Sequence, residues 1–72
     1  MNQEIKLLDV VALLKAKPSL NLKAGQVGTI VEIFGDSDFE VEFVDKQGRT
    51  IAMLPSKKAD LLVLQYEMEA VR

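Results

Sequence analysis

The fold of this 72-residue chain is decided by the stretch VGTIVEIFGDSDFEVEF, residues 27–43. Its first half, residues 27–34, is rich in β-branched residues and runs directly into Gly35, which is typical of a strand that ends in a turn. Its second half, residues 39–43, alternates apolar residues with glutamate. Because successive side chains of a strand point to opposite faces, the apolar residues should be buried while both glutamates face water.

The chain after this hairpin predicts a third strand and a short return. Residues 45–48 contain turn-forming residues and close a second tight turn, and residues 49–54 come back as the third strand of a meander. Pro55 is predicted to end that strand, because proline has no amide proton to give the ladder. Residues 56–59 are long enough for one helical turn, and residues 61–64 then form a short buried strand.

The chain before the hairpin is less clearly patterned. Within residues 7–14, apolar residues at helical spacing compete with the β-branched pair Val10 and Val11, so the local pattern leaves both helix and strand open. Residues 15–25 are rich in turn formers and predict a long ordered loop folded back over the core. The tail, residues 65–72, has the apolar spacing of a weak amphipathic helix.

This order of elements predicts an all-β fold, a small five-stranded SH3-like barrel with one helical turn before the last strand. Seventy-two residues with 49% hydrophobic and 28% charged side chains suffice for one core. We therefore expect a single domain, residues 1–72, with its core in residues 7–64 and a tail beyond. The glycines assigned to structural turns or close approaches are Gly25, Gly28, Gly35 and Gly48.

The charge is uneven along the sequence. The net charge is −2, and between Gly25 and Asp45 there are six acidic residues and no lysine or arginine. An acidic hairpin repels phosphate, which disfavours nucleic acid, and it suits a basic protein partner. Homodimerisation through the tail or an exposed strand edge also fits the pattern. The candidate partner-binding residues are Glu32, Glu40, Glu42 and Asp45 as electrostatic contacts, with Tyr66 and Met68 as apolar anchors.

The sequence has few of the residue types from which catalytic and metal sites are built. The chain has no histidine and no cysteine, which removes the common general base, the thiol nucleophile and soft-metal ligands. Strand alternation leaves Glu40 and Glu42 side by side on an exposed face, without the burial that a catalytic carboxylate pair needs. The turn at residues 35–38 offers too few ligands for a calcium or magnesium loop. We therefore expect no catalytic residues, no metal and no cofactor.

The sequence also bears on location. No stretch approaches the roughly 20 apolar residues that span a bilayer. The first four residues carry an acid where a signal peptide would be basic. We expect a cytoplasmic protein without a membrane span.

The region between residues 8 and 64 resembles a family of short, mostly cyanobacterial proteins catalogued as a domain of unknown function. The matching motifs are residues 9–13, 40–45 and 48–50, together with Leu22, Lys23, Gly25, Val27, Gly28 and Thr29. The resemblance implies that the first apolar run is a strand, and it implies no characterised activity. Residues 25–31 also look like the strand-opening turn of KOW-type ribosomal and transcription modules and of small accessory subunits of photosynthetic complexes.

We therefore expect a non-catalytic protein–protein interaction module. The resemblance implies a second small protein encoded nearby, which fits an antitoxin-like or immunity-like protein that masks a basic partner. One alternative is a KOW-like RNA- or ribosome-associated module, if the fold gathers its lysines on one side. Another is a small accessory subunit of a photosynthetic or other large complex. The lysines in question are Lys15, Lys17, Lys23, Lys57 and Lys58.

Overall fold

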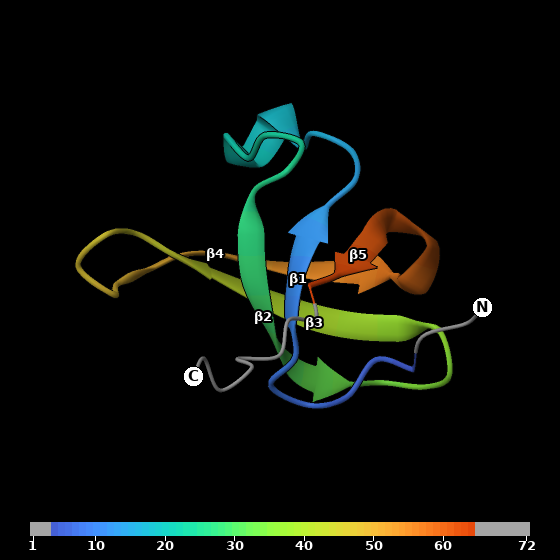
Figure 1. Ribbon diagram of the computed structural model, residues 1–72. Coiled ribbons are helices and arrows are strands. Elements are labelled where there is room, and N and C mark those ends of the chain that lie inside the picture. Colours follow the sequence, from blue (N-terminus) through green and yellow to red (C-terminus); the bar gives the residue numbers. More distant parts are fainter. Residues whose placement is uncertain (1–3, 65–72) are drawn as a thin grey trace, which may run out of the picture.

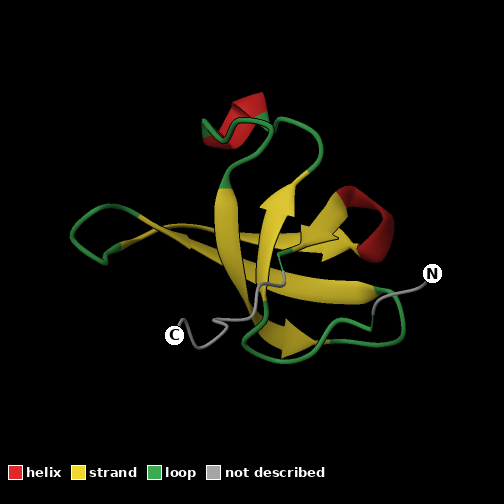
Figure 2. Cartoon of the chain, viewed as in Figure 1, coloured by secondary structure: helices red, strands yellow, loops and turns green. Residues whose placement is uncertain are grey.

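The computed structural model describes residues 4–64, which form one five-stranded antiparallel sheet. The strands are β1 (Val10–Leu13), β2 (Val27–Ile33), β3 (Asp38–Val44), β4 (Thr50–Lys57) and β5 (Leu61–Val63). Two short 3-10 turns, η1 (Pro18–Leu20) and η2 (Lys58–Asp60), lie in the connections and are drawn red in Figure 2. The spatial order β4-β3-β2-β1-β5 and the helical turn before the last strand confirm the predicted all-β, SH3-like class.

The sheet curls around its own apolar side, with the β3–β4 hairpin extending to one end (Figure 1). Strand β3 shows why: Phe39, Val41 and Phe43 are buried, whereas Glu40 and Glu42 alternate with them on the other face. The predicted alternation is therefore confirmed. The buried cluster draws on four strands, the first loop and the N-terminal segment, and consists of Ile5, Val11, Leu13, Leu22, Ile30, Phe39, Val41, Phe43, Leu61 and Val63. Ala52 and Leu54 of β4 are partly buried and pack against it.

The first apolar run forms strand β1, as the family resemblance implied, but only over Val10–Leu13. The preceding Leu7 and Leu8 are exposed, and Leu8 takes a positive φ of 72° in a turn. Ile5 lies further upstream and is buried, so the core begins before the predicted start at residue 7.

The long loop between β1 and β2 folds back over the core, as predicted. A bridge between Lys17 and Leu22 closes it, with the Lys17 N–H donating to the Leu22 carbonyl at 2.8 Å. Leu22 is 2% exposed and belongs to the core cluster, whereas Leu20 remains exposed. The loop therefore caps one end of the curled sheet.

Gly28 lies inside β2, where a side chain would not fit. A Cβ at this position would stand 2.7 Å from Val41 Cγ1 and 2.8 Å from Phe43 Cε1, both closer than carbon atoms approach. It would also stand 2.9 Å from the Glu42 carbonyl oxygen. The close approach predicted for this glycine is confirmed, and it allows β2 and β3 to curl together.

Pro55 does not end its strand, and that prediction was wrong. β4 continues through Pro55 to Lys57, because β4 is an edge strand and only one of its sides needs donors. The Lys58 N–H donates to the Ser37 carbonyl, which makes the facing pair of Asp38 and Lys57 a non-hydrogen-bonded pair. Pairs alternate along an antiparallel ladder, so Pro55 directs its nitrogen away from β3, where no hydrogen bond is lost.

Other boundaries shift by one or two residues. β3 begins at Asp38, which was predicted to lie in the turn, and Phe34 falls outside β2. The helical turn occupies Lys58–Asp60 rather than residues 56–59. In β5 the central Leu62 is half exposed, so this strand is buried on one face only. Within residues 4–64, no helix has the length and apolar character needed to cross a membrane.

Candidate protein-binding face

The side of the sheet that faces away from the core carries the predicted acidic residues, and we call it the outer face. Two glutamates, Glu32 on β2 and Glu40 on β3, stand directly opposite each other in the ladder. Glu40 in turn stands opposite Pro55 on β4. Among residues 4–64, no salt bridge or side-chain hydrogen bond involves either glutamate. The two glutamates are therefore direct neighbours across the strands, and neither is paired with a cation among these residues.

A β-bulge in β2 creates this pairing. The register shifts between Ile30, which pairs with Val41, and Glu32, which pairs with Glu40. Plain alternation from the buried Ile30 would have directed Glu32 toward the core. The extra residue, Val31, instead returns Glu32 to the outer face.

The next row of the outer face is mixed. Thr29 pairs with both Val10 and Glu42, and Glu42 pairs with Met53. The Glu42 carboxylate accepts a hydrogen bond from the Thr50 hydroxyl, so Glu42 differs from Glu32 in having a partner of its own. Met53 is 46% exposed and supplies apolar surface beside the carboxylates.

A third row, on the β2-β1-β5 half of the sheet, is apolar. Ala12 pairs with Val27 on one side and with Leu62 on the other. Val27 and Leu62 are each 50% exposed. The outer face is thus acidic on the half of the sheet that contains β3 and β4, and apolar on the half that contains β1 and β5.

Asp45 has a local role at the β3–β4 turn. Its Oδ1 accepts the backbone N–H groups of Arg49 and Gln47, each at 2.9 Å, and its Oδ2 accepts Arg49 Nε at 2.9 Å. The Arg49 backbone hydrogen bond, chiefly, holds the pKa of Asp45 below its usual value. This carboxylate is already engaged, unlike Glu32 and Glu40.

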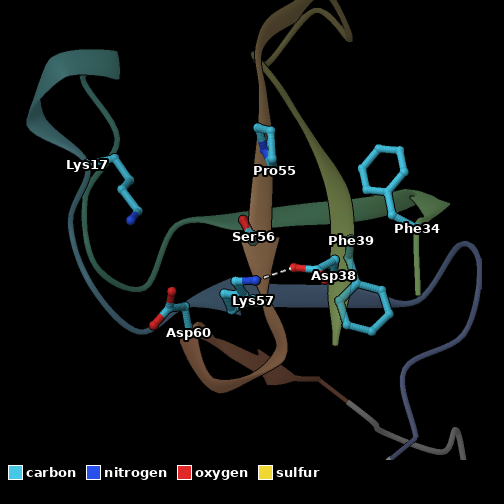
Figure 3. Close-up of a pocket in the computed structure, with 8 residues that line it drawn as sticks. All are labelled: Lys17, Phe34, Asp38, Phe39, Pro55, Ser56, Lys57 and Asp60. Atoms are coloured by element: carbon cyan, nitrogen blue, oxygen red, sulfur yellow. Dashed lines mark hydrogen bonds and ion pairs between the residues drawn. The ribbon is translucent and has the colours of Figure 1, made fainter. Parts of the chain in front are cut away.

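We call the row formed by Glu32, Glu40 and Pro55 on neighbouring strands the acidic row. A groove of about 580 Å³ lies beside it (Figure 3). Its apolar walls include Phe34 and Pro55, and its charged residues are Lys17, Asp38, Lys57 and Asp60. Lys57 Nζ donates to Asp38 Oδ1 at 2.6 Å, and this hydrogen bond raises the pKa of Lys57 above its usual value. The sequence did not predict this groove, because its residues come from the first loop, the β2–β3 turn, two strands and η2 and meet only in the folded chain.

The predicted contact residues are therefore distributed unevenly. Glu32, Glu40 and Glu42 share the outer face, while Asp45 is separated from them in the hairpin turn. Tyr66 and Met68 lie outside the described residues. Of the lysines, Lys17 and Lys57 line one groove, but carboxylates line it with them.

The described residues offer no cluster of three or more carboxylate, histidine or cysteine side chains that could hold a metal ion. Every buried side-chain nitrogen or oxygen in this part of the chain has a hydrogen-bond partner. Ser56, the one buried polar residue within residues 4–64, donates its hydroxyl to the Leu54 carbonyl at 3.3 Å.

Comparison with known proteins gives a family and no further relatives. No curated protein and no solved structure gives a significant match to this chain. A family model described as "Domain of unknown function (DUF4926)" matches residues 7–63, which covers all five strands. The chain therefore belongs to the DUF4926 family.

Proposed function

We propose that this protein is a non-catalytic protein-binding domain that masks a basic partner, in the manner of an antitoxin or immunity protein. The observation that carries the proposal is the facing pair of Glu32 and Glu40, which have no cation among the described residues. Like charges directly opposite in an antiparallel ladder are destabilising. A cationic partner would relieve that repulsion, so the pair favours association. We further propose that the protein acts in the cytoplasm, on sequence grounds.

Apolar surface beside the carboxylates supports the same function. Pro55 stands opposite Glu40, and the exposed Met53 stands opposite Glu42. Protein interfaces combine an apolar centre with charged residues that steer encounter and set register. The outer face has both components on neighbouring strands.

An RNA-binding role is the second candidate, because Lys17 and Lys57 line the same groove. It has weaker support, since Asp38 already pairs with Lys57 and Asp60 lines the groove as well. A phosphate entering there would meet carboxylates. The role of accessory subunit draws its support from the exposed Val27 and Leu62, which flank the buried Ala12 on the outer face.

The test is co-purification from native extract with the tagged full chain as bait. We expect one small basic protein to be recovered in stoichiometric amount and released as ionic strength rises. The double variant Glu32→Gln/Glu40→Gln should lose it. The matched control Glu4→Gln/Asp36→Asn removes the same charge from exposed positions off the acidic row and should retain the partner.

Three outcomes would contradict the proposal. Equal recovery by both double variants would remove the acidic row from the interface. Recovery of RNA with a steep salt dependence would favour the nucleic-acid role. Recovery of a large complex that survives high salt would favour the accessory-subunit role.

A further inference from the structure

An exposed aromatic residue, Phe34, lines the groove beside the acidic row. Phe34 follows β2 directly, and its side chain is 57% exposed. Its backbone N–H donates to the Asp38 carbonyl at 2.8 Å, which fixes the residue at the groove. Figure 3 shows the Phe34 ring pointing the opposite way from the Phe39 ring, which enters the core. A large aromatic residue is thus held at the groove with more than half of its surface exposed.

The charges around this wall leave a negative excess. Lys57 and Asp38 neutralise each other at 2.6 Å. Of the remaining groove residues, Lys17 and Asp60 carry opposite charges. The facing glutamates of the outer face adjoin the groove, because Glu40 stands opposite the groove residue Pro55 and Glu32 stands opposite Glu40. The groove and its rim are therefore complementary to a cation.

The bulge in β2 brings the aromatic and acidic elements together. It directs Glu32 to the outer face, and Phe34, two residues later, follows the end of β2 and lines the groove together with Pro55, which stands opposite Glu40. The two carboxylates stand in adjacent strands, where facing Cβ atoms are about 4.5–5.5 Å apart. An occupant must therefore present a cation that reaches both carboxylates and an apolar surface that covers a ring.

We propose that the basic partner inserts an arginine at this groove. Its guanidinium bridges the Glu32 and Glu40 carboxylates, and its plane lies on the Phe34 ring. This inference rests on the proposed function and specifies its chemistry. Arginine fits better than lysine because its planar fork donates to two carboxylates at once and stacks on aromatic faces, whereas lysine is a compact and strongly hydrated point charge.

The probes are two labelled decapeptides, one alternating arginine with serine and the other alternating lysine with serine. Each is titrated at low salt into the ¹⁵N-labelled full chain. We expect the arginine peptide to bind about two- to fivefold more tightly, the range given by an exposed cation–π contact. The backbone signals of Phe34, Glu32 and Glu40 should move together.

Substitution of the ring separates this inference from the proposed function. Phe34→Leu keeps an apolar side chain and should reduce arginine-peptide binding to the level of the lysine peptide. Phe34→Trp should tighten it. The control Ile33→Leu changes a neighbouring exposed apolar residue and should leave both peptides unaffected. Because Phe34 is more than half exposed, these variants should keep the fold. The ¹⁵N spectrum of each variant, recorded without peptide, will show whether it does.

The possible results distinguish failure of the arginine inference from failure of the proposed function. If both peptides bind equally, Phe34→Leu has no effect and Glu32→Gln weakens both, the arginine inference is wrong and the proposed function stands. If neither peptide moves the signals of Glu32 and Glu40, the arginine inference and the proposed function are both wrong. If the arginine preference disappears only in Phe34→Leu, the inference is supported.

Discussion

Single residues show how closely this small sheet is packed. Gly28 has no room for a Cβ, because two side chains and a backbone oxygen of β3 occupy the space within 3 Å. The glutamates of the same strand pair, Glu32 and Glu40, face each other with no counter-charge in the described part of the chain. The glycine lies in the packed interior, whereas the two glutamates lie on the outer face.

Replacing Gly28 tests the packing directly. Gly28→Ala should destabilise by about 1–3 kcal/mol, the usual range for overpacking a tight core, because the Glu42 carbonyl is backbone and cannot rotate aside. The control is Gly35→Ala, where a Cβ meets nothing within 4 Å and where a neutral or slightly stabilising effect is expected. Chemical denaturation of the three proteins measures both effects. Equal stability of Gly28→Ala and wild type would refute the close approach.

The hairpin turn provides a pH test at the same scale. Because Asp45 has a folded-state pKa below its usual value of 3.8, its hydrogen bonds contribute stability that is present above pH 3.8 and lost as pH falls through the folded pKa. The backbone amide signals of Gln47 and Arg49 should therefore change together in an acid titration with a midpoint below 3.8. Asp45→Asn should abolish this transition. A midpoint at or above that value would contradict the assignment.

At the scale of elements, β4 explains how an open edge is protected. Pro55 sits within an exposed edge strand with its nitrogen directed outward, so one donor that a neighbouring chain could use is missing. Lys57 places a charge at the end of the same strand. The edge is thereby a poor template for pairing with another chain.

Substitution of Pro55 tests this edge. Pro55→Thr restores an outward N–H and adds a good strand former, so self-association should rise with protein concentration. Met53→Thr is the matched control, since its residue occupies an equivalent edge position that already has an N–H. Sedimentation velocity over a range of concentrations compares them. Identical monomeric behaviour of both variants would show that the proline does not protect the edge.

The element scale also shows what the sequence can and cannot predict. Alternation through residues 39–43 and the glycine at position 28 were sufficient to predict the buried face and the close approach. The continuation of β4 through Pro55 was not predictable, because a proline is tolerated only where the strand lies at an edge, and strand order is a tertiary property. The pairing of Glu32 with Glu40 likewise depends on a bulge that leaves no periodic signal.

The groove was missed for a related reason. Phe34 lies at the end of an apolar run, and its sequence neighbours resemble those of a core residue. Its exposure follows from the end of β2 at Ile33, one residue earlier than the predicted boundary. Lys17 and Asp60, which meet at the groove, are 43 positions apart in the chain. Boundaries and long-range neighbours are the features that local pattern specifies least.

At the scale of the whole molecule, the curled sheet has two distinct sides. The inner side holds a core built from four strands, against which β4 packs Ala52 and Leu54, and it accounts for stability. The outer side has an acidic row, a mixed row and an apolar row in succession. We infer that the acidic row is maintained for binding at some cost to folding, since removing one of its charges should stabilise the chain.

That trade-off is tested most directly by Glu32→Gln, measured for thermal unfolding and for arginine-peptide binding on the same sample. Relief of the facing charges should stabilise by about 0.2–1 kcal/mol, which raises the Tm by about 1–8 °C, and binding should weaken. Glu42→Gln, whose carboxylate accepts from Thr50 and faces no acid, should not raise the Tm. Two results would contradict this account. A lower Tm for Glu32→Gln than for wild type would show that the facing charges do not cost stability, and an unchanged affinity for the arginine peptide would show that the acidic row does not bind it.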